Sequence, residues 1–145
     1  MDFLYNHTIG RLYQGLIQHL AQSVFGITLI RPAGAAVDHK SAELGSLVSN
    51  VVTLLVDLTE QQRWISDLAL DILFFPDIGM VPSTYLLAFS RFAPVQMVAW
   101  GHPDSTGLET IDYFISAAGL EPPNGEAYYT ERLVKLNRLP CLFEP

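Results

Sequence analysis

The chain has 145 residues, of which 50% are hydrophobic and 16% are charged, and its net charge at pH 7 is −7. This length suffices for one α/β domain, and the apolar surplus predicts a mostly buried parallel sheet or a surface covered by another domain. The acidic balance argues against nucleic acid and an anionic membrane surface as partners, because both require a basic patch.

The cysteine content and the length of the apolar runs indicate in which cellular compartment the protein is expected. The lone cysteine, Cys141, excludes a disulfide within the chain and fits a reducing cytosol, so we expect a cytoplasmic protein. Apolar runs such as Ile72–Phe75 and Val95–Trp100 are too short to span a bilayer, and the first residues lack the basic segment of a signal peptide.

The first third of the chain predicts one clear helix and two strands. Apolar residues recur at helical spacing over Thr8–Val24, and Ile27–Arg31 has the composition of a short buried strand. The segment Pro32–Ser46 is rich in Gly, Ala and Pro and predicts a loop with at most a weak helix. The β-branched run Val51–Asp57 predicts the second strand.

A capping-box pattern, Thr59 followed by Gln62, predicts the start of the next helix. We expect its buried face to consist of Trp64, Ile65, Leu68 and Ala69. Beyond it, Pro82 and Ser83 start a helix that carries apolar residues up to Phe92.

The remaining elements alternate in type. The expected strands are Ile72–Phe75, Val95–Trp100, Tyr113–Ser116 and Leu133–Leu136, and Glu126–Arg132 is expected to be a short helix. Strands alternating with helices through short connections predict an α/β fold, a Rossmann-like domain with a parallel, doubly wound sheet of five or six strands. No linker divides the sequence, which predicts a single domain over residues 1–145.

Ligands of open α/β sheets gather beyond the carboxyl ends of the strands, and two segments follow such ends: Phe75–Met80 and Gly101–Gly107. The second combines His102, Asp104, two hydroxyls and two glycines. Glycines allow close backbone approach, and hydroxyls with amide groups hold phosphate or sugar oxygens. The alternative is a polar turn whose side chains bond to their own backbone.

His7 is the second candidate, because it precedes the first helix, with Thr8 as a potential N-cap. The positive end of the helix dipole favours neutral imidazole, which is the form that a general base needs. The alternative is a surface or capping histidine. His19 and His39 have no partners at suggestive spacing, and the scattered histidines with one cysteine predict no metal site.

The stretch Asp71–Gly107, DILFFPDIGMVPSTYLLAFSRFAPVQMVAWGHPDSTG, closely resembles the catalytic region of bacterial and plant SPINDLY-type O-GlcNAc transferases, glycosyltransferase family 41. Residues 2–3 with 6–8, 111–116 and 129–136 resemble the same family in the same order and spacing. The resemblance implies a GT-B architecture, in which two Rossmann-like domains face each other across a cleft. This chain corresponds to the N-terminal domain.

The resemblance also implies what is absent and what the enzyme does. The strand before Asp2 and Phe3 and the C-terminal donor domain are missing from this sequence, and a tetratricopeptide array usually precedes the family's catalytic region. The family transfers GlcNAc from UDP-GlcNAc to Ser or Thr of proteins without a metal or other cofactor. We expect this chain alone to be inactive.

By the same resemblance, His7 matches a family histidine considered as a base or acceptor contact. The residues that match the loop on the donor side of the cleft are His102, Asp104, Ser105, Thr106 and Gly107. Asp77 stands where animal relatives have asparagine. We expect His7 and the loop to border one groove. The alternative function is a non-catalytic Rossmann-like module that binds a nucleotide or a protein.

Overall fold

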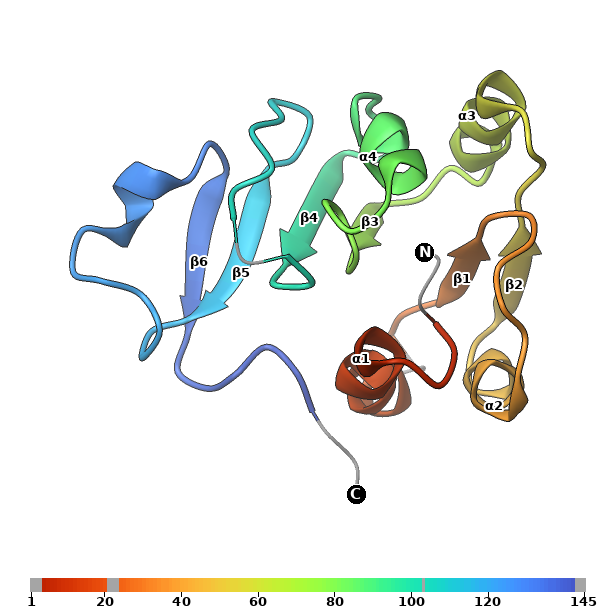
Figure 1. Cartoon of the computed structure of the whole chain (residues 1–145), viewed down its shortest axis with the longest axis horizontal. Helices are drawn as coiled ribbons and strands as arrows, with labels where there is room; N and C mark the ends of the chain where they lie inside the picture. The colour runs from red at the N-terminus through yellow and green to blue at the C-terminus, as the bar shows by residue number, and fades with distance from the viewer. Residues whose placement is uncertain (1–3, 21–23, 103, 143–145) are drawn as a thin grey trace. The chain divides into compact units, whose positions relative to one another are not determined.

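The computed structural model describes residues 4–20, 24–102 and 104–142. The chain forms two compact units, one comprising residues 1–56 with 141–145 and the other residues 57–140 (Figure 1). The expectation of one domain over the whole chain stays a prediction.

The first unit contains a two-stranded parallel sheet and two helices. Its elements are α1 (Thr8–His19), β1 (Thr28–Arg31), α2 (His39–Ser46) and β2 (Asn50–Thr53). Thr28 of β1 lies opposite Asn50 of β2, and α2 makes the crossover between these strands. Its hydrophobic cluster joins Leu4, Ile17, Leu29 and Leu44, so both helices bury one side against the sheet.

Three expectations for the first unit were wrong, and one of them is the second strand, which covers Asn50–Thr53 instead of Val51–Asp57. The first helix ends at His19 instead of Val24, because Leu20 leaves the helical conformation with ψ 123° while its amide still bonds to the Leu16 carbonyl. Val24 is exposed, and residues 21–23 lie outside the described part. The expected loop contains α2, which starts at a reciprocal capping box between Asp38 and Ser41 that outweighs the Gly/Ala/Pro-rich composition before it.

The second unit is built on a four-stranded sheet. Its strands are β3 (Ile72–Phe75), β4 (Val95–Ala99), β5 (Tyr113–Ala117) and β6 (Arg132–Leu136), and its helices are α3 (Leu58–Asp67), α4 (Pro82–Ala88) and the 3₁₀ turn η1 (Gly125–Tyr128). The strand order is β3-β4-β5-β6, and each pairing is parallel (Figure 1). The α/β fold with parallel sheets is therefore confirmed. The carboxyl ends of these strands share one edge.

The boundaries in this unit differ from expectation where a local cap decides them. Asp57, and not Thr59, caps α3, because its carboxylate accepts the Glu60 amide at 3.0 Å. Gln61 and Ile65 form the buried face, whereas Trp64 and Ala69 are exposed. The short helix expected over Glu126–Arg132 is the 3₁₀ turn, and Arg132 already opens β6.

A buried polar residue, Gln96 of β4, ties the sheet to its connections. Its side chain accepts the Phe92 amide at 2.8 Å and donates to the Thr110 carbonyl at 2.9 Å. Its own amide donates to Asp112, whose pKa is lowered by the Arg91 guanidinium. Because each of these groups would be costly to bury unpaired, the network ties the segment before β4 to the segment before β5. None of the described helices is long and apolar enough to cross a bilayer.

Candidate functional site

The two segments that the sequence singled out beyond β3 and β4 lie in contact. A Cβ on Gly101 would fall 1.7 Å from the Pro76 carbonyl oxygen, so only glycine fits there. Gly79 has φ +90°, and a Cβ on it would lie 2.9 Å from Cγ of the His102 ring. The glycines therefore allow the backbone after β3 and the loop after β4 to pack directly against each other.

Asp77 lies within this contact and is completely buried. Its backbone carbonyl accepts the Met80 amide at 3.1 Å, which closes the turn after β3. The structure thus places Asp77 inside the protein, beneath the loop that carries His102, and its expected place in the cleft wall stays a prediction.

Glu131, which sequence reasoning missed, holds the Gly101–Gly107 loop. This residue is 4% exposed and precedes β6. Its carboxylate accepts the Ser105 hydroxyl at 2.8 Å, the Thr106 amide at 2.8 Å and the Thr106 hydroxyl. In the sequence, Glu131 lies within residues 129–136, which resemble the family, and within the segment expected to be a short helix. Neither observation indicates its bonds to the loop, because these partners stand about 25 positions away.

The alternative of a self-bonded polar turn describes part of this loop. The Gly107 amide donates to the Ser105 hydroxyl at 3.3 Å, and the Leu108 amide donates to the Thr106 hydroxyl at 3.2 Å. Gly107 has φ +70°, which favours glycine at this position. The loop is therefore both locally bonded and anchored from a distance by Glu131, and its shape is fixed.

His102 and Asp104 lie at the exposed side of the loop. Nδ1 of His102 is 3.8 Å from the Asp104 carboxylate and accepts the Asp104 amide at 3.5 Å. Their side chains are 43% and 82% exposed, so solvent screens this pair. Among the described residues, no group of three or more His, Cys, Asp or Glu side chains is arranged to hold a metal ion.

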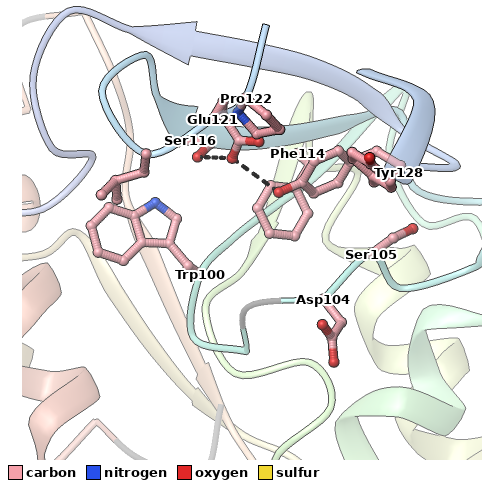
Figure 2. A pocket seen from close by; sticks show the side chains of 10 residues that line it. Trp100, Asp104, Ser105, Phe114, Ser116, Glu121, Pro122 and Tyr128 are labelled. Carbon is pink, nitrogen blue, oxygen red and sulfur yellow. Dashed lines mark hydrogen bonds between the residues drawn. The ribbon is translucent and has the colours of Figure 1, made fainter. Parts of the chain in front are cut away.

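A hollow of about 640 Å³ opens beside the loop (Figure 2). Its walls consist of Trp100, Asp104, Ser105, Phe114, Ser116, Leu120, Glu121, Pro122, Tyr128 and Tyr129. The Glu121 carboxylate accepts the hydroxyls of Ser116 and, at 3.0 Å, Tyr129. Burial, followed by the bond to Glu121, raises the pKa of Tyr129 to about 12, so its hydroxyl is a neutral donor.

His7 is itself the N-cap of α1, whereas Thr8 is the first helical residue. Its Nδ1 accepts the Ile9 amide at 3.4 Å, which places the ring proton of the neutral form on Nε2. The turn before it is held by Asp38, which accepts the Asn6 amide at 2.8 Å. His7 belongs to the first unit and the loop to the second, so their sharing one groove stays a prediction.

No family model matches the chain. It is 50% identical over 46 residues to the probable UDP-N-acetylglucosamine–peptide N-acetylglucosaminyltransferase SPINDLY of Solanum lycopersicum. These residues make up 32% of this chain and 5% of that protein. It is 35% identical over 65 residues to the UDP-glucose:protein N-β-glucosyltransferase of Actinobacillus pleuropneumoniae, covering 45% of this chain and 10% of that one.

The fold matches a mutant of the O-GlcNAc transferase of Thermobaculum terrenum, with a TM-score of 0.84 and 25% identity. The match covers 95% of this chain but 26% of the bacterial chain. The protein therefore spans only a small part of each relative. It is homologous to part of the SPINDLY-type O-GlcNAc transferases and related to protein glycosyltransferases.

Proposed function

We propose that this chain forms the acceptor-side wall of the cleft of a cytoplasmic protein O-glycosyltransferase, which moves GlcNAc from UDP-GlcNAc to a Ser or Thr hydroxyl without a metal. The observation that carries the proposal is the 50% identity to a SPINDLY protein over 46 residues. The fixed loop at the carboxyl edge of the parallel sheet supports it, because this edge is where α/β folds bind their ligands.

The chemistry of the loop favours a shaping role over a charge-stabilising role. The amides of Thr106, Gly107 and Leu108 already donate to acceptors within this unit. The hollow beside them contains two carboxylates and no Lys, Arg or His. A diphosphate leaving group would be repelled there. We therefore assign its stabilisation to a donor domain outside this sequence, with Ser105, Thr106 and Gly107 shaping the opposite wall.

His7 would receive the proton of the acceptor hydroxyl. In the tautomer that this bond requires, Nε2 carries the proton, so acting as a base through Nε2 requires Nδ1 to take over the proton and release the Ile9 amide. At 3.4 Å this cap is long, and its loss is inexpensive. An asparagine at position 7 keeps a good N-cap but cannot titrate, which separates the two roles.

The test measures transfer of labelled GlcNAc from UDP-GlcNAc to acceptor proteins. It compares the 145-residue chain with a chain extended by the remaining catalytic region of its relatives. We expect labelling only by the extended chain, and a loss of about 10²–10⁴-fold in kcat for His7→Asn. His39→Asn, at the exposed start of α2, is the matched control.

Two outcomes would contradict the proposal. Equal labelling by both chains would place a complete donor site within these 145 residues. Nucleotide binding without transfer by the extended chain would favour the non-catalytic binding module.

A further inference from the structure

We propose that the hollow between the Gly101–Gly107 loop and η1 binds the cationic side chain of a lysine or arginine in a polypeptide. Its ten lining residues include four aromatic rings and two carboxylates but no basic side chain (Figure 2). We take this polypeptide to be the protein that accepts the sugar, and this part rests on the proposed function. The binding of the cation itself does not.

The negative charge around the hollow lacks a counter-charge. Glu121 lies in the wall, and its carboxylate is held by the hydroxyls of Ser116 and Tyr129. Glu131 lies behind Ser105 and Thr106 and is held by hydroxyls and an amide. Within the described part of the chain, neither glutamate forms an ion pair with Lys or Arg. Partly desolvated carboxylates with only neutral donors stabilise an incoming cation.

Four other carboxylates among the described residues do lie beside a basic side chain. Lys40 pairs with Glu43, Arg91 with Asp112, and Lys135 with Glu126. Asp104, at the exposed rim, has His102 beside it. Glu121, in the wall of the hollow, and Glu131, behind Ser105 and Thr106, have no such basic partner among the described residues.

Aromatic faces form the rest of the walls. Phe114 is completely buried and packs against Tyr129, with ring centroids 4.6 Å apart, while Tyr128 is exposed at the rim. The faces of aromatic rings attract ammonium and guanidinium groups, most strongly where water is excluded. A cation entering the hollow would therefore lie close to the rings of Tyr128 and Tyr129 and to the oriented Glu121 carboxylate.

A polypeptide fits better than a free amine because it also brings carbonyl oxygens. The indole nitrogen of Trp100, in the wall, is buried and has no hydrogen-bond acceptor among the described residues. A backbone carbonyl of a polypeptide in the hollow would supply one where the side chains around the indole move to admit it. A neutral sugar would leave the carboxylates uncompensated, and a diphosphate would be repelled.

The test is an NMR titration of the 145-residue chain that follows the indole N–H signals of its two tryptophans. The probes are a capped Gly-Arg-Gly peptide, the same peptide with neutral citrulline, spermidine and free GlcNAc. Trp64 is an internal control, because it lies beside Glu60 and Asp67 but also beside Arg63. We expect the arginine peptide to shift the Trp100 signal, with binding about tenfold weaker for citrulline.

Glu121→Gln removes the charge but keeps an oxygen that can accept the Ser116 and Tyr129 hydroxyls. We expect this variant to bind the arginine peptide about tenfold more weakly. Glu109→Gln, which removes one charge at an exposed position outside the hollow, should bind like the wild type. A retained spectrum of the variant shows that it is folded.

Each remaining outcome would overturn the proposal. A Trp100 shift with GlcNAc and none with arginine would identify a sugar site, and tighter binding of spermidine than of the peptide would identify a free amine as ligand. Equal affinity of Glu121→Gln and wild type, or equal shifts of Trp64 and Trp100, would show nonspecific attraction to an acidic surface. Because the titration needs no UDP-GlcNAc and measures no transfer, it can fail or succeed independently of the glycosyltransferase assay.

Discussion

Each unit of the molecule holds its candidate segment with a carboxylate from a distant position, but the two carboxylates lie in different surroundings. In the first unit, Asp38 accepts the amide of Asn6, 32 residues away, next to His7. In the second unit, Glu131 accepts the amide of Thr106, 25 residues away. Asp38 is half-buried and also caps its own helix, α2. Glu131 is buried, and its carboxylate accepts hydrogen bonds from Ser105 and Thr106 of the loop.

The difference shows how much each turn depends on its carboxylate. Asp38 is not alone in holding the turn before His7. The amides of Ile9 and Arg11, at the start of α1, donate to the His7 ring and to the His7 carbonyl. Water can replace the Asn6–Asp38 bond, because this bond is exposed to solvent. At Glu131, the hydroxyls of Ser105 and Thr106 have their main acceptor in one buried side chain. Loss of this side chain leaves several donors unpaired, so the second turn should be the more sensitive.

The largest expected effect is that of Glu131→Ala, which leaves the Ser105 hydroxyl and both donors of Thr106 without this acceptor. We expect it to lower the free energy of unfolding of the second unit by about 3 kcal/mol. Glu131→Gln keeps one acceptor oxygen and should cost about 1 kcal/mol. Both tryptophans, Trp64 and Trp100, lie in this unit, so tryptophan fluorescence during urea unfolding reports on it.

Glu109→Ala, at an exposed position of the same unit, is the control and should change stability by less than about 0.5 kcal/mol. If Glu131→Ala behaved like this control, the loop would be held by its local bonds, and the comparison between the two carboxylates would be lost.

A smaller effect is expected at Asp38. Its pKa is lowered chiefly by the hydrogen bond from the Ser41 amide and next by that from Asn6. A lowered pKa in the folded state means that this stabilisation is present above the ordinary value near 4 and is lost as the pH falls through the folded value. We expect the amide signals of Asn6 and Ser41 to titrate together in NMR spectra, with a midpoint below pH 4.

In Asp38→Asn the two amide signals should no longer show this acid titration, while signals around the Arg91–Asp112 pair continue to do so. A midpoint at the ordinary aspartate value in the wild-type protein would mean that the turn before His7 is not held by the charged carboxylate.

The sequence predicted the sheet better than the carboxylates that hold the loops. Strand Ile72–Phe75 was located at its observed bounds, and the six strands and their parallel arrangement follow from β-branched runs alternating with helical segments. Such signals are local. The helix α2 was expected to be a loop because the Gly/Ala/Pro-rich composition was given more weight than the Asp38–Ser41 capping box. Both residues of that box can be read in the sequence.

The contacts that shape the candidate site could not be found in this way. Glu131 and Ser105 are far apart in sequence, and the close approach of Gly101 to Pro76 arises only when β3 and β4 pair. The glycines and hydroxyls of the loop were correctly selected as unusual. What they contact depends on tertiary structure, and so does the burial of Asp77.

The smallest expected effect concerns Tyr129, which reports on the charge around the second carboxylate. Its pKa is raised to about 12 by burial first, then by Glu121, and to a lesser extent by Glu131 and Asp104. A tyrosine with a raised pKa stabilises the folded state below its ordinary value near 10, and this contribution is lost as the pH rises toward 12. Subtracting the absorbance titration of Tyr129→Phe from that of the wild type isolates its phenolate. We expect Glu121→Gln to lower the midpoint, Glu131→Gln to lower it less, and Glu109→Gln to leave it unchanged, since only the first two remove charge near the phenol. A midpoint that is the same in all three variants would show that burial alone raises this pKa, and the carboxylates near Tyr129 would then not form the negative environment that distinguishes the second unit from the turn at Asp38.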